Sequence, residues 1–345
     1  MDLYVFENCS SETISRSSVH LYTSIIVHVI TLVFLINALL LNLCSMVVWW
    51  REASGIVQYE LLGWISCCDL IQSVGAFTYL IVHDTGLFYA HVNIALIRII
   101  SVLSVLCVIL KLTFASSSAT LLGLVTFMQY VVNKFSSVVQ IPKALTSIVF
   151  TILTIDLMLT FPSSRLVNVR VCVPQLSIEF VRNSKSTSYW YAIIMEGFIK
   201  PISTYVIIIG MAIVLYINIP NPEMKTEKTL LAIEMSLFII KLNILFVVMR
   251  FTDFSYLLIL WYGFDDQKEN LLYILASFMY NISNSLHGCI SFFVYYSSSK
   301  TFRNGFSYFS KRAMFSRFIN KEPLSFSSRS PVQAAKETIS SETNE

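Results

Sequence analysis

The chain has 345 residues, of which 55% are hydrophobic and 13% are charged, and its mean hydropathy is +0.68. Because soluble domains average about 25% charged residues, this composition excludes a water-soluble core and indicates a membrane protein. The net charge is only +3, and the Lys and Arg residues gather near the C-terminus, so there is no basic stripe that would bind nucleic acid.

Seven apolar segments of about 20 residues or more follow one another along the chain. They are Leu21–Trp49, Val57–Val82, Arg98–Val132, Pro142–Phe161, Tyr189–Ile217, Thr229–Phe251 and Leu271–Ser297. These runs are apolar on all faces and lack the alternating pattern of a membrane barrel, so they predict helices. The expected fold is an all-α membrane protein, a seven-transmembrane helix bundle over residues 21–299.

Two further segments follow the bundle. Phe302, Phe306 and Phe309 recur at helical spacing with basic residues between them, which predicts a short amphipathic eighth helix over residues 300–318 on the inner leaflet. An unstructured basic segment held near anionic lipid is the alternative. Residues 319–345 are rich in Ser, Lys and Glu and predict a disordered cytoplasmic tail.

The distribution of Lys and Arg predicts the orientation in the membrane. With residues 1–20 as an extracellular N-terminus, the cytoplasmic side receives more basic residues near the membrane, among them Arg51 and Lys134. Asn8 begins an Asn-Cys-Ser sequon, which fits a glycosylated extracellular leader, although three-residue matches also arise by chance. The C-terminus is then expected in the cytoplasm.

Ionisable residues inside the apolar runs need a partner or water, so each is a candidate for a functional site. Asp69 lies in the middle of the second run, and Asn42 lies at a comparable depth in the first. Together they could organise buried water or a sodium ion. The alternative is that Asp69 is a hydrogen-bonded packing residue. The other residues of this kind are Lys111, Asp156, Glu196, Lys200, Glu234 and Lys241.

Lys111 is the first candidate for ligand binding. It precedes the inner end of the third run by about 18 residues, or roughly 27 Å, which places it in the outer half of the bundle. It could bind a ligand carboxylate or pair with Glu196, and Lys241 could complete the same site. The alternative is that both lysines reach to the interface or form internal pairs.

Seven cysteines are spread along the chain without the spacing of a zinc or redox motif. Cys107, near the top of the third run, and Cys172, in the long second outer loop, would both lie in the oxidising compartment. A disulfide between them would hold that loop over the ligand site; two free thiols are the alternative. Catalytic and phosphate-binding motifs are missing, so we expect neither an enzyme nor a cofactor.

Several short motifs occur in the order found in rhodopsin-like G-protein-coupled receptors. Asn42 and Asp69 match polar residues of the first two helices, and residues 117–123, Ser-Ser-Ala-Thr-Leu-Leu-Gly, resemble a third-helix stretch. Residues 284–291, Asn-Ser-Leu-His-Gly-Cys-Ile-Ser, are the best match. The chain thus resembles rhodopsin-like receptors, and more narrowly the nematode class W chemoreceptors, which are related to FMRFamide-type peptide receptors.

The resemblance implies a ligand site between helices three, five, six and seven and an inner surface that binds a heterotrimeric G protein. It adds Ser291 to the polar network of Asn42 and Asp69. It also places four residues near the intracellular partner: Gln129, Tyr130, Lys225 and Arg303.

Three departures from the family pattern bear on this expectation. Met128-Gln129-Tyr130 stands where those receptors have an Arg that serves in the inactive lock and in the coupled state, which puts efficient coupling in doubt. The residues Ser291-Phe-Phe-Val-Tyr295 stand in place of Asn-Pro-x-x-Tyr. The usual disulfide cysteine would fall near Ser104, one turn from Cys107.

We therefore expect a multi-pass plasma-membrane receptor, chemosensory or peptide-binding, in which a small-molecule or peptide ligand shifts a two-state bundle. A second hypothesis is a transporter or ligand-gated channel that uses Asp69, Asp156, Lys111 and Lys241 as a path. Inverted repeats with paired broken helices would support that hypothesis, and the sequence shows none. A receptor fold that has lost signalling is the third.

Overall fold

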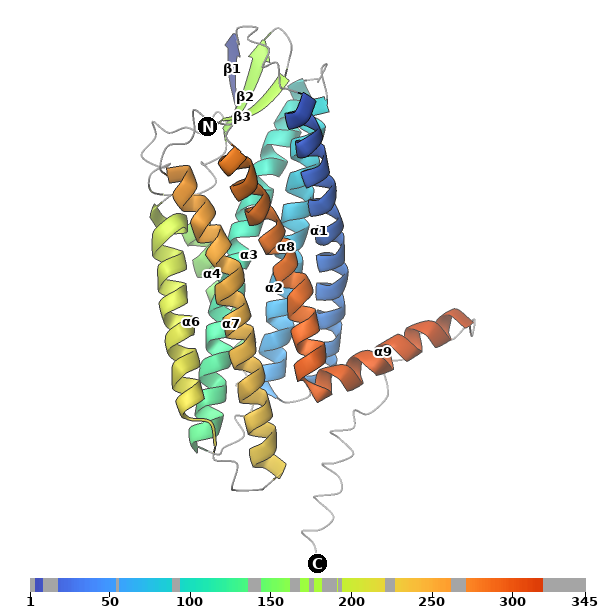
Figure 1. Cartoon of the computed structure of the whole chain (residues 1–345), viewed down its shortest axis with the longest axis vertical. Helices are drawn as coiled ribbons and strands as arrows, with labels where there is room; N and C mark the ends of the chain where they lie inside the picture. The colour runs from blue at the N-terminus through green and yellow to red at the C-terminus, as the bar shows by residue number, and fades with distance from the viewer. Residues whose placement is uncertain are drawn as a thin grey trace, which may run out of the picture.

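The computed structural model describes residues 4–8, 18–53, 56–88, 94–135, 144–161, 168–173, 177–181, 191, 194–220, 227–261 and 271–318. Within these ranges, seven long helices lie side by side in a bundle (Figure 1). They are α1 (Ser18–Glu52), α2 (Val57–Phe88), α3 (Ile94–Phe135), α4 (Leu145–Thr160), α6 (Lys200–Ile217), α7 (Glu227–Trp261) and α8 (Leu271–Ser298). A further helix, α9 (Lys300–Phe318), leaves the bundle at one end, and a small sheet lies at the other end.

Among the residues described, five helices are long and apolar enough to cross a membrane. Their spans are Val29–Glu52, Val57–Ile81, Val102–Phe135, Lys200–Ile217 and Thr229–Phe251. The outward surfaces carry large apolar side chains, such as Val206 at 66% and Ile244 at 58% exposed. Because water does not tolerate so much exposed hydrocarbon, the chain is a multi-pass membrane protein that contacts lipid. Membrane crossing by α4 and α8 stays a prediction.

Most helix limits agree with the predicted apolar runs to within a few residues. The helix α8 ends at Ser298 against a predicted Ser297, whereas α7 continues to Trp261, beyond the predicted Phe251. The largest difference lies before α6, which begins at Lys200 after a π-helical turn over Met195–Ile199. Pro201 explains this start, because a proline without an N–H fits the first turn of a helix and not its interior.

The helical fold is confirmed, and a small sheet adds to it at the end of the bundle away from α9. There β1 (Tyr4–Asn8) pairs in parallel with β2 (Asn168–Val173), which pairs antiparallel with β3 (Ser177–Val181). For the segment between α4 and α6, which contains β2 and β3, the sequence predicts a long outer loop. Its strand signal is the alternation of Val169, Val171 and Val173 with polar or small residues, which is typical of a strand with one apolar face.

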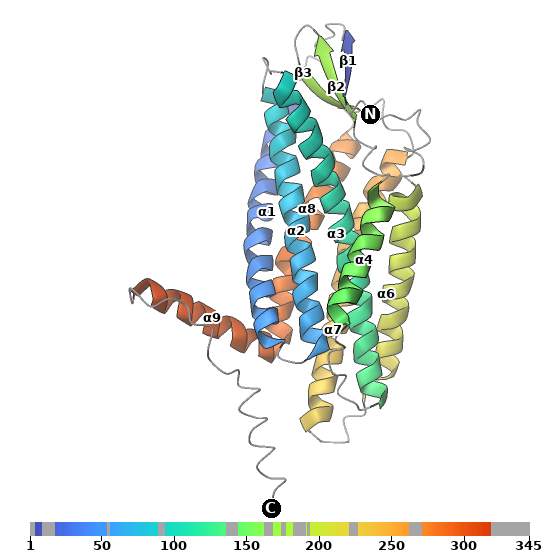
Figure 2. The same ribbon diagram turned by 180° about the vertical axis from the view of Figure 1, so that it is seen from behind.

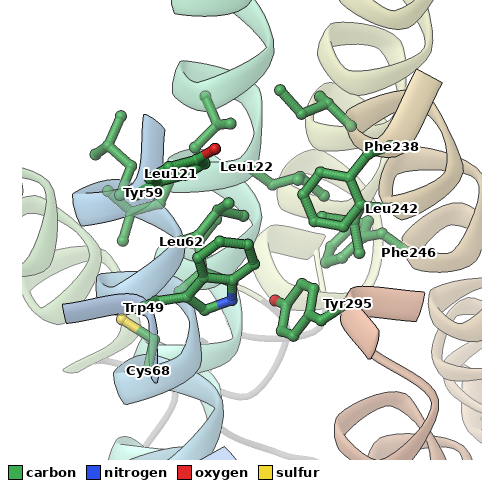
Figure 3. Packing of buried hydrophobic residues seen from close by; sticks show 14 of the residues in the cluster. Trp49, Tyr59, Leu62, Cys68, Leu121, Leu122, Phe238, Leu242, Phe246 and Tyr295 are labelled. Atoms are coloured by element: carbon green, nitrogen blue, oxygen red, sulfur yellow. The ribbon is translucent and has the colours of Figure 1, made fainter. Parts of the chain in front are cut away.

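An aromatic cluster packs the half of the bundle nearest α9 (Figure 3). Its central residue, Trp49 on α1, is fully buried. The centroid of its ring lies within 6.0 Å of aromatic rings on α2, α7, α8 and α9, which belong to Tyr59, Phe238, Tyr295 and Phe302. Figure 3 shows the indole nitrogen of Trp49 and the hydroxyl of Tyr295 turned toward each other. Five helices therefore meet at one side chain.

The predicted helix over residues 300–318 is confirmed as α9. Its first turn is capped by Ser299, whose Oγ accepts a hydrogen bond from the backbone N–H of Phe302 at 3.2 Å. Phe302 is fully buried, whereas Phe309 is 39% exposed, so the apolar face turns gradually from the bundle toward the surroundings. The predicted location on the inner leaflet stays a prediction, and the tail over residues 319–345 lies outside the described residues.

The contact between α1 and α8 requires a glycine at position 288. A Cβ on Gly288 would lie 2.6 Å from Asn42 Nδ2 and 3.3 Å from Ala38 Cβ, and both side chains are buried. We expect Gly288→Ala to lower the free energy of unfolding by about 1–3 kcal/mol, because overpacking forces neighbouring helices apart. Thermal unfolding of the purified protein measures this, with Gly210→Ala as the control, since nothing lies within 4 Å of a Cβ at Gly210. Equal melting temperatures for the two variants would contradict the expectation.

Candidate functional site

Polar side chains of α3 form hydrogen bonds to neighbouring helices at two depths of the bundle. The run of three serines, 116–118, bonds to two carboxylates in the middle of the bundle. A second set around Gln129 bonds near the end that carries α9. Lipid offers no partner for buried polar groups, so these groups must find partners on other helices. The candidate sites therefore converge on α3.

Asp69 on α2 is the centre of the middle site. Its Oδ1 accepts a hydrogen bond from Ser118 Oγ at 2.7 Å, and its Oδ2 lies 3.9 Å from Nδ1 of His287 on α8. All three residues are buried, and a cavity of about 10 Å³ beside them is also lined by Ser291 and Tyr295. A space of this size holds one water at most, so the site is closed to larger ligands in this conformation.

The structure brings the predicted polar network together only in part. Asp69 and Ser291 line the same cavity, but the hydroxyl of Ser291 donates to the carbonyl oxygen of His287 in its own helix. Asn42 Nδ2 has no hydrogen-bond partner among the described residues and lies against Gly288. His287, which the sequence offered only as part of a motif, takes the place beside the carboxylate. A sodium ion at this site stays a prediction.

Asp156 on α4 forms a second carboxylate site with α3. Its Oδ1 and Oδ2 accept hydrogen bonds from the hydroxyls of Ser116 and Ser117, at 2.9 Å and 2.7 Å. One turn along α4, Thr160 Oγ1 accepts a hydrogen bond from Lys200 Nζ on α6 at 2.7 Å. Two of the ionisable residues singled out in the sequence thus have internal partners, as expected of buried polar groups that hold helices together.

Gln129 is the centre of the second site and is 1% exposed. Its Oε1 accepts a hydrogen bond from Gln58 Nε2 on α2 at 3.3 Å. Its Nε2 shares two hydrogens among Asn133 Oδ1 at 3.0 Å and, on α7, Ala232 O at 3.3 Å and Ser236 Oγ at 3.2 Å. Asn133, one turn farther along α3, donates to the same Ser236 hydroxyl at 2.9 Å. We call these five residues the amide latch, because they join α2, α3 and α7 through uncharged groups.

Lys241 does not lie in the predicted ligand site with Lys111. Asn243 Nδ2 donates to Thr126 Oγ1 at 3.0 Å, which fixes the relative height of α7 and α3. Lys241 is two residues from Asn243, whereas Lys111 is 15 residues, or about 22 Å, from Thr126 along α3. The exposed Lys241 instead donates through Nζ to Ser298 Oγ, at the end of α8, at 3.2 Å. The prediction that Lys111 and Lys241 belong to one ligand site is therefore wrong.

Lys111 and Glu196 stay candidates at the outer half of the bundle. Lys111 is half-buried, on a part of α3 that packs against Gly75 of α2. Glu196 belongs to the π-helical turn before α6, and its side chain lies outside the described residues. Lys200 bonds to Thr160, one turn beyond Asp156 on α4, and Asp156 bonds to serines that follow Lys111 on α3 by five and six residues. The π-helical turn before Lys200 therefore lies at a depth comparable to that of Lys111.

Arg250 on α7 is a candidate that the sequence prediction missed. Its Nη2 donates to Gln72 Oε1 on α2 at 3.1 Å, and its Cζ lies 5.5 Å from the ring centroid of Phe246. The same ring lies 5.8 Å from that of His287, so Arg250 and the Asp69 site are separated by one aromatic side chain. The sequence did not indicate this inward orientation, because Arg250 lies next to the end of an apolar run, a position typical of a residue at the membrane boundary.

The predicted disulfide between Cys107 and Cys172 is wrong. Cys107 is a free, buried cysteine, 13 residues or about 20 Å from the first residue of α3. Its backbone packs against Gly75 of α2, inside the bundle. Cys172 belongs to β2, in the sheet at the end of the bundle (Figure 1). A disulfide needs Cα atoms within about 7 Å, which these positions do not allow.

The residues predicted to meet an intracellular partner lie at the expected end of the bundle where they are described. Gln129 is buried in the amide latch, and Tyr130 accepts a hydrogen bond through its hydroxyl from Lys134 Nζ at 3.0 Å. Arg303 Nη1 donates to two carbonyl oxygens at the end of α8, at 2.7 Å and 3.0 Å. Lys225 lies outside the described residues, and so does the side chain of Asn8.

Comparison with known proteins does not assign a family. No protein-family model matches the sequence, and no curated protein matches it closely enough to be a relative.

Proposed function

We propose that the chain is a rhodopsin-like receptor with seven membrane crossings, an extracellular N-terminus and a cytoplasmic surface that binds a heterotrimeric G protein. The amide latch is the observation that carries the proposal. It joins α3 to α7 at the end of the bundle away from the sheet. A receptor needs a contact at that end that holds the closed state and can be broken by a ligand bound elsewhere.

The strength of the amide latch suits a two-state element. Hydrogen bonds between membrane helices average about 0.6 kcal/mol, so the two bonds from Gln129 to α7 are worth roughly 1–2 kcal/mol. Conformations separated by a few kcal/mol keep the minor state populated at about 0.1–10%. A ligand with modest preference for the open state then shifts the population.

The other polar contacts of α7 near this end are also weak. Glu234 Oε2 lies 3.7 Å from Lys300 Nζ at the start of α9, and the Lys300 side chain is 71% exposed. Lys241 donates one hydrogen bond to Ser298. Exposed ion pairs contribute about 0–1 kcal/mol. Displacing α7 at this end therefore breaks few strong polar interactions, and it separates Phe238 from the aromatic cluster around Trp49.

The proposed ligand binds in the outer half of the bundle and carries an acidic group. Lys111 on α3 supplies positive charge there, and Arg250 on α7 supplies it nearer the middle of the bundle, beside the Asp69 site. An ionised group within the membrane favours an oppositely charged partner. Small carboxylates and peptides with an acidic group both fit this description. Glu196 is still part of the proposed ligand site, whereas Lys241 is not.

The described contacts favour a receptor over a transporter or channel. Asp69 and Asp156, two of the residues proposed to line a path, each accept hydrogen bonds from serines of α3. The cavity beside Asp69 measures only about 10 Å³. Carboxylates in a permeation path would instead face water.

The amide latch gives the test of this proposal. Gln129→Ala removes both bonds to α7, and we expect basal signalling per receptor at the cell surface to rise on the order of tenfold, since 1.4 kcal/mol is a factor of ten. The measurement is second-messenger output in cells that co-express a promiscuous G protein. Asn37→Ala is the matched control. Among the described residues the exposed Asn37 amide donates only to Val33 O in its own helix, so this substitution should leave the output unchanged.

Two outcomes would contradict the proposal in different ways. If spin labels on α3 and α7 report a larger separation in Gln129→Ala while signalling stays at the background, the chain keeps the receptor fold without coupling. If the purified wild-type protein in a planar bilayer carries a ligand-evoked current, the chain is a channel.

A further inference from the structure

A groove of about 320 Å³ opens between α4 and α6, with α3 as its floor. Ala119, Gly123 and Phe127 line it from α3, Ile148 and Ile152 from α4, and Ile207 from α6. At roughly 30 Å³ for each water-sized group, the groove has room for about ten methylene groups.

The groove exists because α4 and α6 each pack against α3 and diverge over its small residues (Figure 2). Above the groove, the hydrogen bond from Lys200 to Thr160 joins α4 to α6. Ala119 and Gly123, four residues apart, have the spacing that commonly brings two membrane helices into contact. Gly123 is buried, and the atom that a Cβ on it would meet is Ile207 Cγ2 on α6, at 3.7 Å, an ordinary contact distance.

The surroundings of the groove determine the kind of occupant. Its lining belongs to α4 and to the apolar spans Val102–Phe135 and Lys200–Ile217, and Phe127, Ile148 and Ile207 are 46%, 40% and 57% exposed. The mouth of the groove therefore opens toward hydrocarbon. Only an apolar molecule dissolved in the membrane can fill it without leaving polar groups unpaired.

A basic residue lies on the same face of α3, beyond the groove. Phe127 and Lys134 are seven residues apart, so they share one helix face at a separation of about 10 Å. Lys134 is exposed, and its ammonium donates one hydrogen bond to the Tyr130 hydroxyl. An ammonium has three donors, so two have no hydrogen-bond partner among the residues that the structure describes and can bind an anionic group at the membrane surface.

We propose that this groove binds one acyl chain of an anionic phospholipid, from the leaflet at the C-terminal end of α3, with the lipid phosphate held by Lys134. The chain fills the space between α4 and α6, and the charge of the lipid selects it over zwitterionic lipid. The proposal requires only that the bundle crosses the membrane, so it holds or fails independently of receptor function.

Native mass spectrometry of the full chain, extracted from vesicles of equal parts phosphatidylcholine and phosphatidylserine, tests the proposal. The wild type is expected to retain one phosphatidylserine. Gly123→Leu fills the groove from its floor, and we expect the retained fraction to fall about tenfold. Gly210→Leu is the matched control, because it adds the same side chain on α6 outside the groove. Equal retention by the two leucine variants would overturn the proposed site.

The charge is tested separately with Lys134→Gln and Lys134→Arg. Lys134→Gln should retain a phospholipid but lose the preference for phosphatidylserine, and Lys134→Arg should keep the preference. An unchanged preference in Lys134→Gln would overturn the phosphate contact. Retention of added oleate or cholesterol in place of phospholipid would overturn the proposed occupant.

A labelling experiment on the wild type keeps the proposal testable if Gly123→Leu does not fold. Phosphatidylserine with a photoreactive acyl chain should label the α3 peptide that contains Gly123. Labelling spread evenly over all lipid-facing helices would show that the groove binds no particular lipid.

Discussion

Trp49→Ala is expected to lower the free energy of unfolding by about 3 kcal/mol or more. The Trp49 side chain is fully buried and contacts aromatic rings on α2, α7, α8 and α9. Alanine would leave a large cavity at the point where five helices meet. Helix packing in a membrane depends on close contact more than on the hydrophobic effect, so the lost contacts are not replaced. Thermal unfolding of the purified protein in lipid nanodiscs measures the loss.

The neighbouring residue supplies the control for this experiment. Trp50 is 42% exposed on the surface of α1 and makes an edge-to-face contact with Trp64 at 5.7 Å. Lipid fills the space that Trp50→Ala creates, so its effect should be less than half that of Trp49→Ala. Equal destabilisation by the two substitutions would show that the buried cluster is not what stabilises the half of the bundle nearest α9.

Asp69→Ala should lower the free energy of unfolding by roughly 2–4 kcal/mol. The substitution removes the carboxylate that accepts a hydrogen bond from Ser118 and lies beside His287. It also enlarges a cavity whose volume is about 10 Å³ in the wild type. Buried polar groups without partners and a larger cavity are both unfavourable. The melting temperature in nanodiscs is again the measurement.

Asp69→Asn separates the hydrogen bond from the charge. The amide oxygen still accepts a hydrogen bond from Ser118, so we expect this variant to lose less than half as much stability as Asp69→Ala. If both variants lose the same amount, the interaction between the carboxylate and His287, 3.9 Å apart, is the one that stabilises the bundle.

Part of the candidate site could be predicted from isolated residues in apolar runs. Asp69 and Asp156 were identified in this way, because a carboxylate in lipid requires a partner. Their partners were harder to identify. Serine is common in membrane helices, and only its position opposite a carboxylate distinguishes the run of serines 116–118. Gln129 lies near the C-terminal end of α3, and its contacts with α7 were not expected from the sequence.

The amino-acid sequence by itself determined where the helices of this protein lie. Each helix satisfies its own backbone hydrogen bonds, so the limits of α8 and α9 follow from local composition. Only the tertiary structure decided which residues meet. Helices that are apolar on all sides can slide and rotate against one another without a change in composition. The separation of Lys241 from Lys111, and of Cys107 from Cys172, therefore depended on contacts such as that between Thr126 and Asn243.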